Sequence, residues 1–144
     1  PHDVPVVHRP GARIRIPLGS FDGVHSPLRP PTEVTLLDVT LEAGTELTLP
    51  VPAGRCTFFM PINGSAKVDG EVFGLDDLGV PIFSSVTEAT THKLVAMAGG
   101  SKVAVFIGEP LHQPVISNGP MAFATQESLM AATAAYHRGE MGSL

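Results

Sequence analysis

Fourteen prolines and fifteen glycines are scattered among short apolar runs of this 144-residue chain. Proline lacks a backbone donor and glycine weakens helices, so this punctuation favours short strands and tight turns over long helices. Seven segments show the alternation or the apolar character typical of strands. They are residues 12–17, 35–41, 45–51, 55–62, 81–86, 92–98 and 102–107. The body of the chain is therefore predicted to be all-β.

Three glycine-containing dipeptides are predicted to be turns between these strands. Asp69-Gly70 separates "SAKV" from "EVFG", and a two-residue Asp-Gly loop favours a type I′ hairpin. Asn63-Gly64 is predicted to be a turn, and Gly99-Gly100 a hairpin turn between two apolar strands. The segment "VHSPLRPPTE", residues 24–33, is predicted to be a long loop.

The pattern changes to that of a helix from Thr125. Leu129 and Tyr136 share one helical face, Glu127 complements the helix dipole in the first turn, and Gly139 stands where a C′ residue belongs. We expect this helix to end the fold, with its apolar face packed on the strands. About ten strands and one helix indicate a barrel or sandwich of jelly-roll type.

Charge and cysteine content limit the classes of function. The formal charge is −5, with nine Lys and Arg against fourteen acidic residues, which argues against direct nucleic-acid binding. One cysteine cannot form an internal disulfide, so we expect a reducing, cytoplasmic location. The sequence contains no run of 18 apolar residues and no signal peptide, so no membrane association is expected.

Two stretches resemble the pirin family. Residues 108–142, "GEPLHQPVISNGPMAFATQESLMAATAAYHRGEMG", are similar to its carboxyl-terminal signature. Residues 36–71, "LLDVTLEAGTELTLPVPAGRCTFFMPINGSAKVDGE", are similar to its second cupin barrel. The resemblance implies a cupin-type jelly-roll β-barrel with one C-terminal α-helix. Residues 1–30 would be the inter-barrel segment and long loop, and residues 31–144 the C-terminal cupin barrel with its terminal helix.

Pirins are bicupins, so the resemblance also implies a second barrel. In the family, three histidines and a glutamate hold the metal in the amino-terminal barrel. The resemblance implies that iron or another divalent metal would be bound there, and that the whole protein would be a quercetin 2,3-dioxygenase or a regulator with a protein partner. Because the chain begins with Pro1 rather than methionine, we expect it to be trimmed, processed or taken from a longer chain.

The cupin metal motif can be tested by its spacing. Counting from Gly44 places Pro50 and Pro52 at the two histidine positions, Thr57 at the glutamate position and Gly64 at the closing glycine. Proline has no side-chain donor and a threonine hydroxyl is a poor ligand for a divalent iron or manganese ion. No metal, no other cofactor and no catalytic residue are therefore expected in this chain.

Two histidines are candidates for binding a small ligand. His25 lies beside Asp22 in the predicted loop, where the pair could bind or titrate at a barrel mouth. His92 begins a predicted strand and is the second candidate. Cys56 follows Arg55, but adjacent strand residues face opposite sides, so an inert buried cysteine is expected.

Two functions stay open at this stage. The first is a metal-free structural or interaction half of a pirin-like bicupin, with the amino-terminal barrel as its partner. The second is a free-standing small cupin that binds or transforms a small apolar molecule without metal. Six apolar residues are predicted to line or fill the barrel: Phe58, Phe59, Met60, Phe83, Met97 and Phe106.

Overall fold

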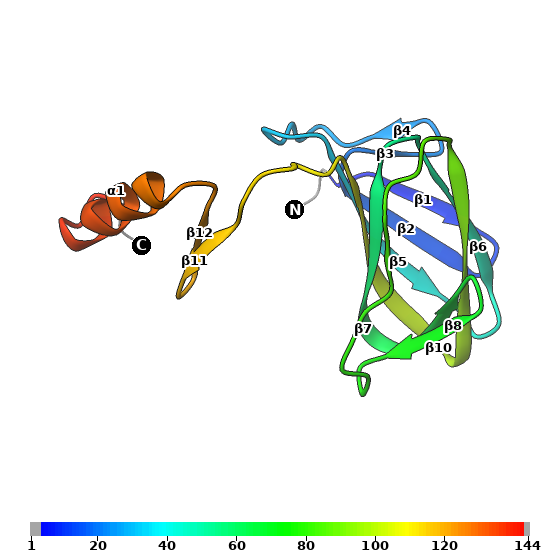
Figure 1. Cartoon of the computed structure of the whole chain (residues 1–144). Helices are drawn as coiled ribbons and strands as arrows, with labels where there is room; N and C mark the ends of the chain where they lie inside the picture. The colour runs from blue at the N-terminus through cyan, green and yellow to red at the C-terminus, as the bar shows by residue number, and fades with distance from the viewer. Residues whose placement is uncertain (1–3, 143–144) are drawn as a thin grey trace. The chain divides into compact units, whose positions relative to one another are not determined.

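The computed structural model describes residues 4–142 and contains two compact units (Figure 1). The first ends at Pro110 and the second begins at Leu111. The first unit contains β1 (Val6–Arg9), β2 (Ala12–Leu18), β3 (Ser20–Phe21), β4 (Val24–His25), β5 (Val34–Leu41), β6 (Glu46–Val51), β7 (Cys56–Val68), β8 (Glu71–Gly74), β9 (Ile82–Phe83) and β10 (Thr90–Gly108). The second contains β11 (Ile116–Asn118), β12 (Met121–Phe123) and α1 (Gln126–His137).

Eight strands of the first unit form one antiparallel sheet that curls into a barrel (Figure 1). Their order is β1-β2-β5-β10-β7-β8, with β6 pairing β10 and β9 pairing β7. The remaining two strands, β3 and β4, form a separate small hairpin. The predicted all-β fold with one C-terminal helix is confirmed.

Alternation along the strands explains why the sheet encloses an apolar interior. In β6, Leu47, Leu49 and Val51 are buried, while the residues between them are exposed. The same alternation recurs in the central strands β5 and β10. The largest fully buried side chains are Phe59, Phe73, Ile14, Ile16, Leu37, Leu49 and Leu94, together with the valines Val39, Val51, Val68, Val103 and Val105.

Two predicted turns are instead irregularities within long strands. β7 runs through Asn63-Gly64 and β10 runs through Gly99-Gly100, and Gly64 lies opposite Ser101 where the pairing register shifts. Gly64 and Gly100 both have positive φ, and a Cβ on Gly100 would lie 2.8 Å from the Leu41 carbonyl oxygen. Glycine therefore serves here to bend paired strands rather than to reverse the chain.

The predicted hairpin at Asp69-Gly70 is confirmed. Val68 of β7 pairs with Glu71 of β8, which leaves a two-residue loop. The φ angles of Asp69 and Gly70 are 48° and 99°, as a type I′ turn requires.

The amino-terminal residues contribute more to the barrel than the sequence indicates. β2 pairs with β5, and its side chains Ile14 and Ile16 are fully buried in the core. Residues 4–30 therefore supply part of the barrel sheet as well as the inter-barrel segment assigned to residues 1–30. The boundary between compact units lies at Pro110, within the predicted domain 31–144. Residues 26–33 lack strands, in agreement with the predicted loop.

The second unit is a β11–β12 hairpin and the capped helix α1. The Thr125 hydroxyl accepts a hydrogen bond from the Ser128 amide at 3.1 Å, which caps the amino terminus of α1. Gly139 has a φ of 74° and donates to the Tyr136 carbonyl, while Glu140 donates to the Ala135 carbonyl, which makes a Schellman cap. Within this unit Leu129 is buried, whereas the Tyr136 side chain is exposed. Packing of the helix on the barrel stays a prediction.

Candidate functional site

The two residues predicted to stand at the histidine positions of the cupin motif are Pro50, in β6, and Pro52, which follows β6. Both are exposed, while Leu49 and Val51 point into the barrel with exposed fractions of 0% and 2%. The inward positions, Leu49 and Val51, carry hydrocarbon side chains that cannot ligate a metal.

The glutamate position is occupied by a buried hydroxyl. Thr57 is 1% exposed, and its Oγ1 atom has no hydrogen-bond partner among residues 4–142. Thr57 pairs across the sheet with Phe83 of β9 and with Ile107 of β10. An apolar surrounding and a single neutral hydroxyl do not fit the imidazole and carboxylate set that iron or manganese prefers.

Elsewhere in the described part of the chain, a metal centre would need a cluster of ligating side chains. Residues 4–142 contain no group of three or more His, Cys, Asp or Glu side chains arranged to hold a metal ion. The donor chemistry of a cupin metal site therefore does not fit these residues.

His92 is buried within the barrel wall rather than exposed to a ligand. Its ring lies 4.1 Å from that of Phe83 and 5.8 Å from that of Phe59, measured between centroids. Its Nδ1 atom lies 2.6 Å from Oδ2 of Asp69, whose Oδ1 also accepts from the Lys93 amide at 2.8 Å. Burial raises the pKa of Asp69, but the hydrogen bonds from Lys93 and His92 outweigh it and lower that pKa. His92 thus ties the β7–β8 turn to the core.

The predicted pair of His25 and Asp22 is not formed. His25 is exposed, and its Nδ1 atom lies 3.1 Å from the Gly23 carbonyl oxygen. Asp22 instead forms an ion pair with Arg9. His25 lines a hollow beside the loop 26–33, and His92 lies outside that hollow. The two histidines therefore do not form one site.

A hollow with a volume of about 720 Å³ opens at one end of the barrel. Its apolar floor consists of side chains that belong to the core or its edge: Phe21, Leu37, Val51 and Ile107. Its polar lining consists of Ser20, Asp22, Glu33, Thr35, Arg55, Thr90 and Thr91. Pro50 and Pro52 also line it, so these two positions belong to the rim. We call this hollow the barrel mouth.

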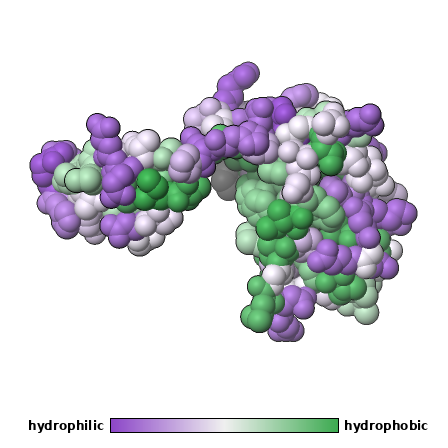
Figure 2. All heavy atoms as spheres, viewed as in Figure 1, coloured by the Kyte–Doolittle hydropathy of each residue, from purple (hydrophilic) through white to green (hydrophobic). Residues whose placement is uncertain are grey.

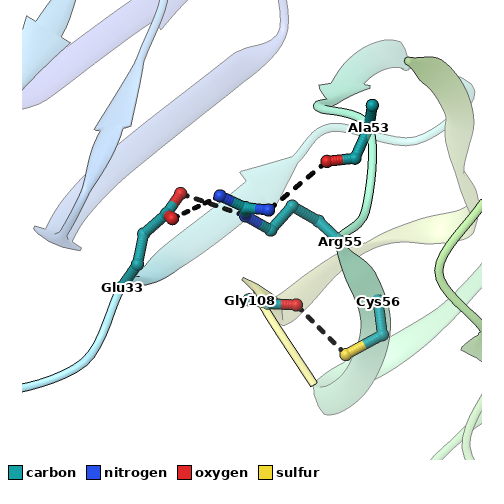
Figure 3. A network of polar contacts seen from close by, with 5 residues as sticks. All are labelled: Glu33, Ala53, Arg55, Cys56 and Gly108. Atoms are coloured by element: carbon teal, nitrogen blue, oxygen red, sulfur yellow. Dashed lines mark hydrogen bonds and ion pairs between the residues drawn. The ribbon is translucent and has the colours of Figure 1, made fainter. Parts of the chain in front are cut away.

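An ion pair between Arg55 and Glu33 bridges the barrel mouth (Figure 3). Arg55 Nε donates to Glu33 Oε1 at 3.1 Å and Nη2 donates to Oε2, so two parallel hydrogen bonds join the groups. Nη1 donates to the Ala53 carbonyl oxygen at 3.3 Å. The hydrogen bond that Arg55 donates to Glu33 raises the pKa of Arg55. Because 22 positions separate the two residues, no local sequence pattern predicts this pair.

Cys56 lies next to this pair but does not join it (Figure 3). Its Sγ atom donates to the Gly108 carbonyl oxygen at 3.2 Å, on the paired strand β10. Cys56 is partly buried, and its predicted inertness stays a prediction.

A curled antiparallel barrel with an apolar interior and one open mouth is the architecture of the cupin class. Residues 36–142 match the family described as the Pirin C-terminal cupin domain. The chain belongs to the pirin family, as the carboxyl-terminal signature predicted.

Individual proteins agree with this assignment. The chain is 28% identical over 145 residues to a Pseudomonas aeruginosa protein provisionally named quercetin 2,3-dioxygenase, and covers 50% of it. It is 24% identical over 152 residues to human pirin, and covers 48% of it. A crystal structure of a quercetin 2,3-dioxygenase from Acinetobacter baumannii superposes with a TM-score of 0.79 at 23% identity, over 99% of this chain and 49% of that one. The last likeness concerns the fold alone.

The chain spans about half the length of the curated relatives it matches. Within residues 4–142, no helix is long and apolar enough to cross a membrane.

Proposed function

We propose that this chain is the metal-free carboxyl-terminal barrel of a pirin-like bicupin and acts as its structural or interaction half. The observation that carries the proposal is the chemistry of the inward positions. Leu49, Val51 and Phe83 are hydrocarbon and Thr57 is neutral, while the buried His92 is bonded to Asp69 and belongs to no cluster of three metal-ligating side chains among the described residues. In this scheme an amino-terminal barrel holds iron or another divalent metal and any quercetin 2,3-dioxygenase activity.

The length and the names of the relatives support this division of labour. Each of the relatives cited above is about twice as long as the matched region, which leaves room for a second barrel of similar size. The Pseudomonas relative is provisionally named for quercetin 2,3-dioxygenase activity. We extend that activity to the complete protein and not to this barrel.

The outer surface of the barrel offers a place for the second barrel. Four apolar residues occupy directly paired positions across β5, β10, β7 and β9: Leu36, Phe106, Phe58 and Ile82. Paired residues share one side of a sheet, and the neighbours Leu37, Val105 and Phe59 are buried on the inner side. The row therefore lies on the outside of the barrel.

This outer apolar face corrects the prediction that Phe58, Met60 and Phe106 fill the barrel. Phe58 and Phe106 stack with centroids 4.4 Å apart and rings inclined by 8°. Met60 is 40% exposed and Ile82 is 71% exposed. Phe59 does fill the core, and Phe83 packs against it, as predicted. Hydrophobic side chains are visible on the barrel surface where Figure 1 places β7 (Figure 2).

A contiguous exposed apolar face is a signature of an interface. We assign it to the amino-terminal barrel, because the relatives carry a second half that must contact the first. In the intact two-barrel protein, Ile82→Asp is expected to lower the melting temperature and to let protease separate the halves. The matched control is Thr40→Asp, an exposed position on β5 outside this row. Equal behaviour of the two variants would overturn the assignment.

Activity provides the direct test of the proposed function. The chain supplied with ferrous iron, quercetin and oxygen is expected to show no ring opening, measured by loss of the flavonol absorbance. Turnover by this chain alone would place the chemistry here and contradict the proposal.

The second candidate function is a free-standing cupin that binds a small molecule without metal. The barrel mouth favours it, since its volume lies within the range of ligand pockets. The coding sequence upstream of Pro1 separates the two. A second cupin with a paired-histidine motif supports the bicupin, and an initiator methionine next to Pro1 supports the free-standing form. Under either form we propose a cytoplasmic location, and for the bicupin a regulatory protein partner in addition.

A further inference from the structure

We infer that the barrel mouth is a binding site for a small organic carboxylate, with Arg55 as the anchor. The inference does not rest on the bicupin proposal, because the mouth is formed within the first compact unit alone. It goes beyond the expected apolar ligand by naming the charged group that recognises it.

Arg55 already presents the geometry that recognises a carboxylate. Its Nε and Nη2 atoms bind both carboxylate oxygens of Glu33, the parallel arrangement that gives guanidinium groups their selectivity for planar oxyanions. The side chain of Glu33 therefore occupies the place that the carboxylate of a ligand would take.

The two members of the pair differ in how firmly they are held. The Arg55 side chain is 21% exposed and is braced by the Ala53 carbonyl. The Glu33 side chain is 61% exposed and ends the irregular segment 26–33, directly after Pro30, Pro31 and Thr32. An exposed ion pair contributes little net stability, so a ligand can displace Glu33 at small cost. The Glu33 carboxylate then competes with the ligand for the Arg55 guanidinium.

The rest of the mouth indicates what the carboxylate is attached to. The hydroxyl groups of Thr35, Thr90 and Thr91 line the wall, while Leu37, Val51 and Ile107 form an apolar floor. Below this floor, Thr57 is paired with Ile107 and carries its unpartnered hydroxyl. These surroundings fit a short apolar or aromatic body that bears few polar substituents.

Charge balance argues for an acid rather than an amine. The other acidic residue that lines the mouth, Asp22, is already paired with Arg9, and Glu109 acts on Arg55 from outside the lining. When a ligand displaces Glu33, the braced charge left facing the cavity is the guanidinium of Arg55. The site is therefore selective for anions once Glu33 has moved.

The experiment measures binding of phenylacetate to the full chain by ligand-observed NMR and calorimetry, with phenylacetamide and benzylamine as neutral and cationic counterparts. Glu33→Gln removes the competing carboxylate and is expected to tighten phenylacetate binding several-fold. Arg55→Gln is expected to weaken it by about tenfold or more, the effect of losing a charge-assisted hydrogen bond. Arg13→Gln, at an exposed position of β2, is the matched control and leaves binding unchanged.

Three outcomes would overturn the inference: no saturable binding of phenylacetate to Glu33→Gln at millimolar concentration, equal binding of phenylacetamide, or preferential binding of benzylamine. The Glu33→Gln arm keeps the test decisive even where Arg55→Gln fails to fold, because it changes only an exposed side chain. Loss of binding in both variants would show that the ion pair is structural.

Discussion

The interior of the barrel and its mouth differ sharply in chemistry, although the same strands form both. At the level of Leu49, Thr57 and Phe83 the interior is mostly hydrocarbon, and its buried imidazole, His92, is bonded to Asp69. Toward the end of the barrel, Arg55 and Glu33 stand in an open hollow. A largely apolar interior and a charged rim thus occur in the same barrel.

The interior and the mouth contribute to two different properties, the stability of the fold and the binding of a ligand. Filling the interior with hydrocarbon adds to the burial that stabilises the fold, at about 25 cal/mol per Å² of apolar surface. The charged residues of the mouth, Arg55 and Glu33, contribute little to that burial. Changes to the interior should therefore act on stability, and changes to the mouth should act on binding.

The largest effect is expected from opening the interior. Phe59 is fully buried against Phe73, Phe83 and His92, so Phe59→Ala should lower the free energy of unfolding by about 3–5 kcal/mol, measured by urea denaturation. Phe58→Ala, its neighbour on the outer face, serves as the control and should cost clearly less. Similar losses for both would contradict the assignment of the two faces.

A smaller loss is expected from Gly100→Ala at the bend of β10. The new Cβ would lie 2.8 Å from the Leu41 carbonyl oxygen, and φ is 79°. Strain of this kind costs about 1–3 kcal/mol, before any shift of β5. Gly99→Ala has a φ of 91° with open space around it, and therefore isolates the backbone cost from the collision. Equal melting temperatures for the two variants would mean that the strands are not packed as described.

Replacing the buried hydroxyl of Thr57 is expected to raise the free energy of unfolding, whereas the two preceding changes lower it. Because Oγ1 has no partner, Thr57→Val is expected to raise the free energy of unfolding by about 1 kcal/mol, the smaller end of the penalty for an unsatisfied group. Thr40→Val, at an exposed position of β5, is the control and should change little. A destabilised Thr57→Val protein would show that the hydroxyl serves a partner, and that the interior is not dry.

The sequence predicted the parts of this molecule that depend on local pattern. Period-two alternation revealed β2, β5 and β6, and the Asp69-Gly70 pair revealed its hairpin. Glycines at bends and glycines at turns look alike in sequence, since both serve positive φ. Gly64 and Gly100 were therefore misassigned.

The candidate site depends on side-chain directions and long-range contacts, which residue spacing along the sequence does not predict. The run "FFM" is apolar throughout, so alternation could not assign Phe58 to the outside and Phe59 to the inside. The spacing from Gly44 found β6 but not the side on which Pro50 lies. The contact between Arg55 and Glu33 arises only when β7 and the start of β5 meet across the mouth.

The smallest effect is expected on the pH dependence of stability at Asp69. The pKa of Asp69 is lower in the folded protein than its ordinary value of 3.8. Its stabilisation is therefore fully present above that value and is lost as pH falls through the lower folded-state pKa. The stability difference between wild type and Asp69→Asn, followed by thermal unfolding, should shrink between neutral pH and pH values below 3.8. Since the side chain is partly exposed, the effect should be modest. A difference that is constant with pH would contradict the role of this carboxylate.

The metal content of the purified chain tests directly whether this barrel is metal-free. The purified chain should be treated with chelator, incubated separately with ferrous iron, manganese, copper and zinc, desalted, and analysed by inductively coupled plasma mass spectrometry. Far less than one equivalent of any of these metals per chain is expected, because Leu49, Val51, Thr57 and Phe83 offer no suitable donors and the nearby His92 has no cluster of further ligands among the described residues. Retention of close to one equivalent, lost on chelation and regained on addition of the metal, would contradict it.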